Sequence, residues 1–179
     1  MYKNLKIEFK EKITEYINKG YYKKAMLYGE IFCFDMLSRP SSSNNALEAL
    51  FYFGISLIHC DSQRRAIDVF SYIKNNTPKD SILYLRASAE LINNKYSRFE
   101  IEDLIEIAIV LKYDLSNCIQ KIYDENNLTS QQIRIAYSTC MNRIMMIYFL
   151  VGNYDLAKQY YDDYHKYHLS IPKCRYSSK

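Results

Sequence analysis

Residues 47–78 read LEALFYFGISLIHCDSQRRAIDVFSYIKNNTP, and this stretch decides the fold. Apolar residues recur in it at helical spacing in two runs with a polar break between them, so it predicts two helices joined by a short turn. Gly54 and Ala66 leave space where two antiparallel helices come closest, and Phe70 fills the gap under the next unit. Pro78 ends the second helix, because proline lacks an N–H and disfavours helical backbone in the residue before it. The stretch therefore predicts one helix–turn–helix unit.

The spacing of these four residues resembles a tetratricopeptide (TPR) repeat, a unit of about 34 residues. Ala66 follows Gly54 by twelve residues, Phe70 follows four later, and Pro78 eight after that. A repeat of this kind buries its apolar faces only against neighbouring units. The resemblance therefore implies an all-α fold, a TPR-like α-solenoid of antiparallel helix pairs.

Two further segments show the same residue spacing, which is typical of a junction between two helices. KGYYKKA places Tyr22 two residues after Gly20 and Ala25 five residues after it, and VGNYDLA repeats this spacing at Gly152, Tyr154 and Ala157. Glycine is the residue that most readily caps a helix C-terminus, so Gly20 is expected to end the first helix. The first repeat departs from the pattern at Gly29, where a large apolar residue is usual.

The sequence predicts a single domain over residues 1–179. Its repeats are expected at about 6–39, 47–80, 81–112 (degenerate) and 131–171, with an irregular segment over 113–130. The residues expected to pack the repeats together are Gly54, Ala66, Phe70, Pro78, Ala25, Ala157 and Tyr161.

Composition and charge narrow the functional classes. The 179 residues carry a net charge of +4 with both signs interspersed, so no basic stripe for nucleic acid is expected. The first residues lack a signal-peptide pattern, and no run is long and apolar enough to span a membrane. The five cysteines are scattered, without a CxxC pair, and read as reduced core thiols. The chain is expected to be intracellular, nuclear or cytoplasmic or both.

Residues suited to chemistry are few. His59 beside Cys60, and His165 with His168 and Cys174, are the arrangements closest to a metal site, but neither has a structural zinc spacing. His59 is better explained as a helix-end residue. Adjacent carboxylates on a helix diverge, and no glycine-rich phosphate loop is present. We expect no catalytic activity, metal, cofactor or small-molecule substrate.

An excess of apolar residues on two helices predicts a homodimer. Residues 46–58 have only two polar side chains, and 21–37 carry apolar residues around the whole circumference. A monomer would then expose a large apolar patch, which a second copy could cover. The alternative is that segment 113–130 or the C-terminal tail folds back over it. The predicted interface residues are Met26, Ile31, Phe34, Leu50, Phe51, Phe53, Leu57 and Ile58.

The order of the units carries a more specific resemblance. YYKKAMLYGE, EALFYFGISL and ILYLRASAEL follow one another, before a helical insertion and a closing repeat. This order is similar to the N-terminal segment of the TPR subunits of the anaphase-promoting complex (cyclosome), most of all the Cdc twenty-seven type and next the Cdc sixteen type. The similarity covers about residues 10–170. It implies a homodimeric, non-catalytic scaffold of a nuclear ubiquitin ligase that acts in mitosis beside other protein subunits. Those subunits dock co-activator tails through a longer C-terminal array, so tail binding is not carried over.

Two other classes compete with this assignment. A peptide-binding adaptor of the co-chaperone kind would line its inner helices with Lys, Arg and Asn, and the inner helix of the second repeat offers almost none. An enzyme ranks third, because the sequence has no catalytic constellation.

Overall fold

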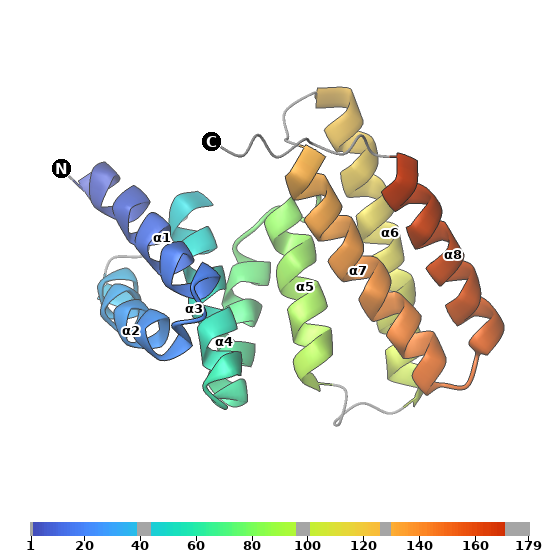
Figure 1. Ribbon diagram of the computed structural model, residues 1–179, viewed down its shortest axis with the longest axis horizontal. Helices are drawn as coiled ribbons and strands as arrows, with labels where there is room; N and C mark the ends of the chain where they lie inside the picture. Colours follow the sequence, from blue (N-terminus) through green and yellow to red (C-terminus); the bar gives the residue numbers. More distant parts are fainter. Residues whose placement is uncertain (1, 39–43, 96–100, 126–129, 171–179) are drawn as a thin grey trace. The chain divides into compact units, whose positions relative to one another are not determined.

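The computed structural model describes residues 2–38, 44–95, 101–125 and 130–170, with side chains over 8–32, 44–93, 103–118 and 136–166. Over these ranges the chain forms eight helices and no strand, which confirms the predicted all-α class (Figure 1). The helices are α1 (Tyr2–Asn18), α2 (Tyr22–Ser38), α3 (Asn44–His59), α4 (Gln63–Asn75), α5 (Ile82–Lys95), α6 (Ile101–Glu125), α7 (Ser130–Leu150) and α8 (Tyr154–Ser170). None of the described helices combines the length and the apolar character that crossing a membrane requires.

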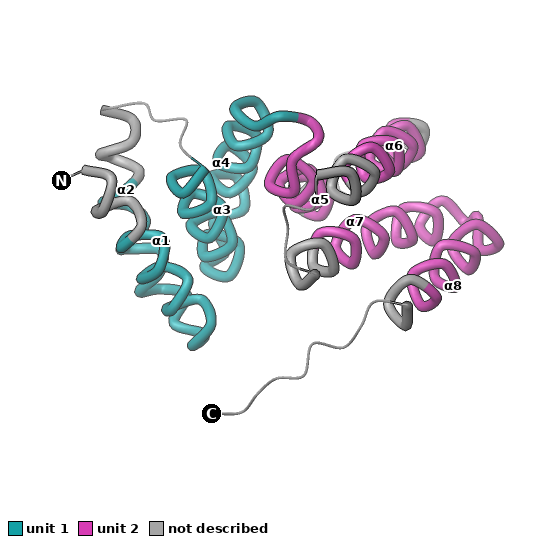
Figure 2. The backbone as a smooth tube through the Cα atoms, turned by 90° about the horizontal axis from the view of Figure 1, so that it is seen from above, with its two compact units in different colours: residues 1–78 teal, residues 79–179 magenta. Residues whose placement is uncertain are grey.

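The chain divides into two compact units, Met1–Pro78 and Lys79–Lys179 (Figure 2). The division falls after Pro78, which follows the end of α4 and lies two residues before the predicted end of the second repeat. The assignment of residues 1–179 to a single domain stays a prediction.

The helices of each unit contact one another in the same order. In the first unit α3 contacts α1, α2 and α4, and in the second unit α7 contacts α5, α6 and α8. In each unit the first two helices also contact each other. The third helix is therefore the most enclosed, and α3 accordingly buries residues on most of its circumference. Each unit thus consists of two helix pairs built on one plan.

Helix α6 differs from the prediction. The sequence predicts that the degenerate repeat ends at residue 112 and that an irregular segment follows over 113–130, whereas α6 runs without interruption to Glu125. Leu111, Leu115 and Cys118 continue the buried stripe at steps of four and three residues, and no Gly or Pro interrupts it. The polar residues between them, which suggested a loop, are the exposed face of the helix.

In three helix pairs, the two helices of the pair are joined by the same type of backbone turn. Gly20 has a φ of 72°, and its N–H donates to the Ile17 carbonyl at 3.0 Å while Tyr21 N–H donates to the Tyr16 carbonyl at 2.8 Å. These two bonds form a Schellman motif, which satisfies the last carbonyls of a helix, so Gly20 caps α1 as predicted. The same pair of bonds recurs at Asp61, whose N–H donates to the Ile58 carbonyl at 3.1 Å while Ser62 N–H donates to the Leu57 carbonyl at 2.8 Å. It recurs again at Gly152, whose N–H donates to the Phe149 carbonyl at 3.1 Å while Asn153 N–H donates to the Tyr148 carbonyl at 2.9 Å.

The alanine five residues after each turn is buried. Ala25, Ala66 and Ala157 each donate their N–H to the residue four before them, in the first turn of the second helix of the pair. Their small side chains let the two helices of a pair approach closely. The structure thus places all three alanines in equivalent positions.

Two glycines mark the closest contacts in the first unit. A Cβ built on Gly54 would lie 2.7 Å from the ring of Phe70, a side chain with no exposed surface. Phe70 thus packs on Gly54 and Phe51 of its own helix pair, whereas the sequence predicts it under the next unit. Ala66 is buried, and Pro78 follows α4 on the surface. A Cβ on Gly29 would lie 2.2 Å from the ring of Phe53, so Gly29 makes room for α3. The departure seen at Gly29 in the sequence is therefore a contact with the next helix.

The premise of the predicted dimer interface is wrong for its central residues. Leu50, Phe51, Phe53 and Leu57 are buried by helices of their own unit, with Phe51 only 2% exposed. These side chains therefore need neither a second copy of the chain nor a folded-back segment to shield them from solvent. Met26 and Ile58 are half-buried, and the side chain of Phe34 lies outside the described residues. Ile31, on α2, is 67% exposed and is the one predicted interface side chain that the structure describes as open.

Candidate functional site

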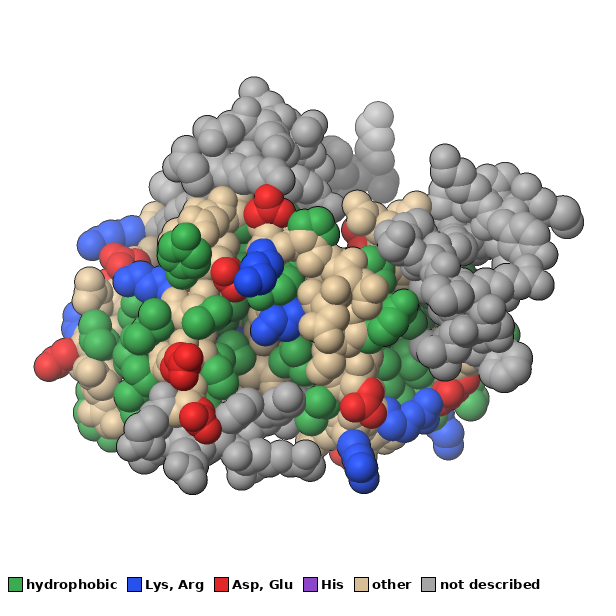
Figure 3. Space-filling model, turned by 180° about the vertical axis from the view of Figure 1, so that it is seen from behind, with side chains coloured by type: hydrophobic (Ala, Val, Ile, Leu, Met, Phe, Trp, Pro, Cys, Tyr) green, Lys and Arg blue, Asp and Glu red, His purple; other side chains and the backbone are tan. Residues whose placement is uncertain are grey.

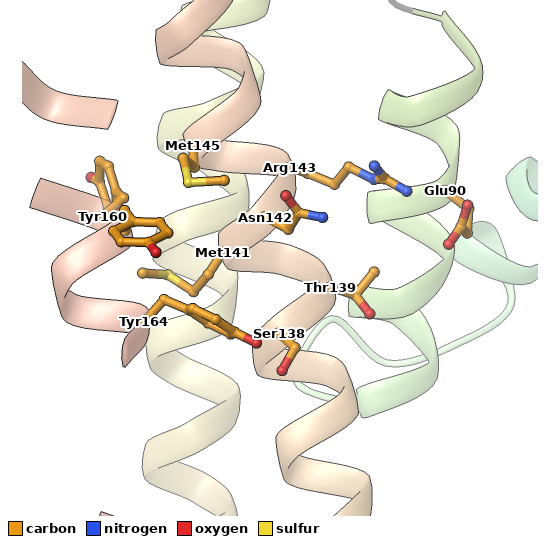
Figure 4. A pocket seen from close by; sticks show the side chains of 10 residues that line it. Glu90, Ser138, Thr139, Met141, Asn142, Arg143, Met145, Tyr160 and Tyr164 are labelled. Atoms are coloured by element: carbon orange, nitrogen blue, oxygen red, sulfur yellow. The ribbon is translucent and has the colours of Figure 1, made fainter. Parts of the chain in front are cut away.

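A hollow of about 420 Å3 opens on the second unit, over the exposed face of α7 between α8 and α5 (Figure 4). Its lining comes from α7 and from two helices that pack against it, α5 and α8. The lining residues are Glu90 from α5; Ser138, Thr139, Met141, Asn142, Arg143 and Met145 from α7; and Tyr160, Tyr161 and Tyr164 from α8.

The side of the hollow toward α8 is aromatic and thioether-rich. Met141 and Met145 lie beside the rings of Tyr160 and Tyr164 (Figure 4). Met141 and Tyr160 are buried, whereas Tyr161 is 50% exposed at the edge. Methionine adapts its shape to irregular apolar surfaces, and tyrosine offers a broad ring with a polar tip, so both are common at binding surfaces. This side can accept apolar side chains of another molecule.

The wall behind Tyr160 holds that ring in place. Its ring stacks on Tyr148 with centroids 5.4 Å apart and planes 5° from parallel. The Lys112 ammonium lies 5.3 Å from the Tyr160 ring centroid, and a hydrogen bond with Tyr160 raises the pKa of Lys112. The tyrosine is therefore fixed by contacts from α6 and α7, which gives the hollow a preformed floor.

The side toward α5 is polar. Arg143 extends from α7 toward Glu90 on α5, and Asn142 lies exposed between the two sides (Figure 4). The Arg143 Nε is buried, and it has no hydrogen-bond acceptor among the described residues. A buried guanidinium N–H without an acceptor costs free energy, so the Arg143 Nε is a polar group that the described residues leave unsatisfied.

A second hollow of about 400 Å3 lies beside the first on α8. It is lined by Tyr161, Asp162, His165 and Lys166, so Tyr161 borders both hollows. Asp162 accepts a hydrogen bond from Lys158 at 2.7 Å, which holds the pKa of its carboxyl below the usual range. The His165 ring stands edge-on to Tyr161 at 4.3 Å. The two hollows thus form one surface, which we call the α7–α8 groove.

Of the residues considered as metal ligands, His59 and Cys60 lie in the first unit, and His165 borders this groove. The side chain of His168 and the whole of Cys174 lie outside the described residues. His59 is the last residue of α3, as predicted, and stacks on Tyr22 with centroids 3.8 Å apart. Burial raises the pKa of the Cys140 thiol to about 12, and its Sγ donates to the Leu85 carbonyl at 3.8 Å. Within the described ranges, no three His, Cys, Asp or Glu side chains are grouped as metal ligands.

The charges on the face seen in Figure 3 are of both signs and are interspersed with hydrophobic side chains. Ion pairs such as Arg65 with Glu30, at 2.7 Å, link neighbouring helices of the first unit. This distribution agrees with the interspersed charge predicted from the sequence.

Sequence reasoning missed most of the α7–α8 groove. Of its residues, the sequence singled out Tyr161 as a packing residue and His165 as a weak metal-ligand candidate, and Tyr161 lies half exposed. The available signal was positional: Tyr161 follows Gly152 by nine residues, as Phe70 follows Asp61. Phe70 is buried against Gly54 and Phe51 of its own pair, whereas Tyr161 lies half exposed at the edge of the hollow.

No protein-family model matches the chain, and no curated protein or solved structure matches it. The similarity to the TPR subunits of the anaphase-promoting complex therefore stays a prediction. The arguments that follow rest on the geometry of the two units.

Proposed function

We infer that the protein is a non-catalytic interaction scaffold of TPR-like helix pairs that binds another protein through the α7–α8 groove. The observation that carries this proposal is the open, preformed groove on the last helix pair, with a Met and Tyr side and a polar side that holds Arg143. Apolar clefts with a few placed polar groups are the usual form of a binding site. The repeated turn at Gly20, Asp61 and Gly152 supports the repeat architecture.

The polar residues of the groove favour the peptide-binding alternative over a scaffold that only self-associates. An adaptor that grips a peptide needs Arg and Asn on its inner helices, and Arg143 and Asn142 stand on α7, the central helix of the second unit. The inner helix of the second repeat, α3, has only Asn44 and Asn45 at its start and is buried over most of its length. Membership of the anaphase-promoting complex remains a separate prediction, and this proposal does not depend on it.

Site-specific photo-crosslinking tests the proposal. A photoreactive phenylalanine at Asn142, which is exposed in the groove, should give a discrete adduct in the host cells of the protein. The same residue at Ser116, exposed on α6 outside the groove, should not. The cross-linked protein, once identified and purified, should bind the unmodified chain in calorimetry. Equal or absent adducts at the two positions would contradict the proposal.

A further inference from the structure

Helix α2 presents an exposed side that is both apolar and basic. Leu27 and Ile31 stand one turn apart on it and are 56% and 67% exposed. They lie on the opposite side of the helix from Gly29, the position against which the Phe53 ring of α3 packs. With the half-exposed Tyr21 just before the helix, they are three of the four large apolar side chains that the structure describes as exposed in the first unit. The exposed apolar surface of this unit is thus concentrated at α2.

Two lysines flank the apolar pair. The helical repeat places Lys23 on one side of the pair and Lys24 on the other, because they precede Leu27 by four and by three residues. Both lysines are exposed, and the Lys24 ammonium lies 5.0 Å from the centroid of the Tyr21 ring. We call the surface formed by Tyr21, Lys23, Lys24, Leu27 and Ile31 the α2 face.

The α2 face carries an excess of positive charge. Neither Lys23 nor Lys24 pairs with a carboxylate of another described residue. Glu30 is the only acidic side chain described on α2, and it is already paired with Arg65 of α4 at 2.7 Å. The two lysines therefore remain available to an anionic partner, which would complement the face in charge.

The arrangement of the α2 face favours a lipid surface over other anionic partners. Leu27 and Ile31 project from a single helix, whereas a helix of a partner protein docks in a groove between elements. A single nucleic-acid strand is held by a basic groove and aromatic stacking, in which exposed aliphatic side chains have no role. A helix at a bilayer surface buries its apolar side chains below the headgroups, and flanking lysines extend their ammonium groups to the lipid phosphates.

We propose that the α2 face binds the surface of an anionic lipid bilayer. Leu27 and Ile31 enter the boundary between headgroups and acyl chains, and Lys23 and Lys24 contact the phosphates on either side. This surface lies in the first unit and is independent of the α7–α8 groove, so its failure would leave the proposed function standing.

Vesicle sedimentation of the full chain tests the role of charge. The chain should bind vesicles of phosphatidylcholine and phosphatidylserine in equal parts, and added salt should weaken this binding. Binding to vesicles of phosphatidylcholine alone should be at least about tenfold weaker. The double variant Lys23→Gln, Lys24→Gln should lose at least about tenfold in affinity for the anionic vesicles. The matched double variant Lys79→Gln, Lys166→Gln changes two exposed lysines elsewhere and should bind nearly as the unmodified chain does.

Tryptophan fluorescence tests the role of the apolar pair. The chain contains no tryptophan, so Ile31→Trp introduces a single probe at an exposed position. Its emission should shift to the blue on anionic vesicles, because the ring leaves water. Ile109→Trp places the same probe at an exposed position on α6 and should not shift. Circular dichroism of each variant in the absence of vesicles checks that it is folded.

Several results would overturn the proposal. These are equal affinity for the two kinds of vesicle, equal weakening by the two lysine pairs, and anionic vesicles that leave the Ile31→Trp emission unchanged. A blue shift that grows with protein concentration alone would assign the α2 face to a second copy. Binding of an acidic peptide or an RNA oligonucleotide that shifts the probe, without binding to vesicles, would assign the face to a protein or to RNA.

Discussion

Gly29 and Gly54 are the residues at which adding one methyl group would disturb the first unit most. Each glycine faces a phenylalanine ring on a neighbouring helix, Phe53 and Phe70 respectively, at less than the contact distance of a real Cβ. Both rings are buried and cannot swing into solvent. The sequence predicted the role of Gly54 because its partner lies within the same repeat. The role of Gly29 depends on Phe53 from the next repeat, which spacing within one unit does not reveal.

Gly29→Ala should destabilise the protein. Overpacking costs about 1–3 kcal/mol, which exceeds the roughly 0.5–1 kcal/mol by which alanine favours a helix over glycine. Chemical denaturation measures the loss. In the double variant with Phe53→Leu, the smaller side chain should make the two effects less than additive. Strictly additive losses would show that the two residues are not in contact.

The cysteines should differ sharply in reactivity. Burial holds the pKa of Cys140 at about 12, whereas Cys60 is only half-buried at the α3–α4 turn. Alkylation of the native protein followed by peptide mass spectrometry should modify Cys60 and spare Cys140. Because the folded pKa lies above the ordinary 9.0, the unfolded state loses its proton first. This contribution to stability should therefore be complete below about pH 9 and decline as the pH rises toward 12. Equal alkylation of both thiols in the folded protein would contradict the assignment of Cys140 to the core.

At the scale of the elements, the turns were predictable and the length of α6 was not. Gly20 and Gly152 indicate their turns in the sequence, because glycine adopts positive φ readily. The third turn has Asp61 at a φ of 57°, and no glycine marks it in the sequence, only the polar break between the two helices. In α6 the buried stripe continues past Leu111, but its exposed face is polar enough to resemble a loop. Local composition could not show that α7 would cover one side of this helix.

Gly152→Ala isolates the cost of the turn. No atom lies within 4 Å of the added Cβ, so the change acts through the backbone alone. An L-residue at positive φ costs roughly 1–2 kcal/mol, partly offset by about 0.4–1 kcal/mol from a less flexible unfolded chain. Gly152→Asn should cost less, because asparagine tolerates this conformation. Thermal unfolding should rank the proteins as Gly, then Asn, then Ala. A variant Gly152→Ala as stable as the unmodified chain would show that the turn is not held at positive φ in solution.

At the scale of the whole molecule, the two units share one plan but differ in what their third helix exposes. Helix α3 is enclosed and apolar, whereas α7 leaves a polar strip with Asn142 and Arg143 open. The sequence showed the apolar excess of α3 but not the helices that would cover it, and this led to the dimer interface. The sequence did not predict the α7–α8 groove, because the groove depends on which residues of α7 and α8 the other helices leave uncovered.

Two substitutions test the revised view of the first unit. Phe51→Glu should unfold it, because an unpaired charge would enter the core. Ile31→Glu should leave the fold intact, because Ile31 is 67% exposed on α2. Circular dichroism and light scattering of both variants check this, and homodimerisation stays a prediction that the mass of the unmodified chain decides. A folded, soluble Phe51→Glu variant would contradict the burial of α3.

The most direct test of partner binding at the α7–α8 groove is the nuclear magnetic resonance spectrum of the methionine methyl groups. Met141 and Met145 line the groove, and Met26 lies in the other unit. On titration with a peptide of the partner that cross-links to position 142, the methyl signals of Met141 and Met145 should shift together and saturate, while Met26 stays in place. The same titration of the Tyr161→Glu variant should leave all three signals unmoved. Saturable binding of the peptide that shifts Met26 and leaves Met141 and Met145 unchanged would contradict the account.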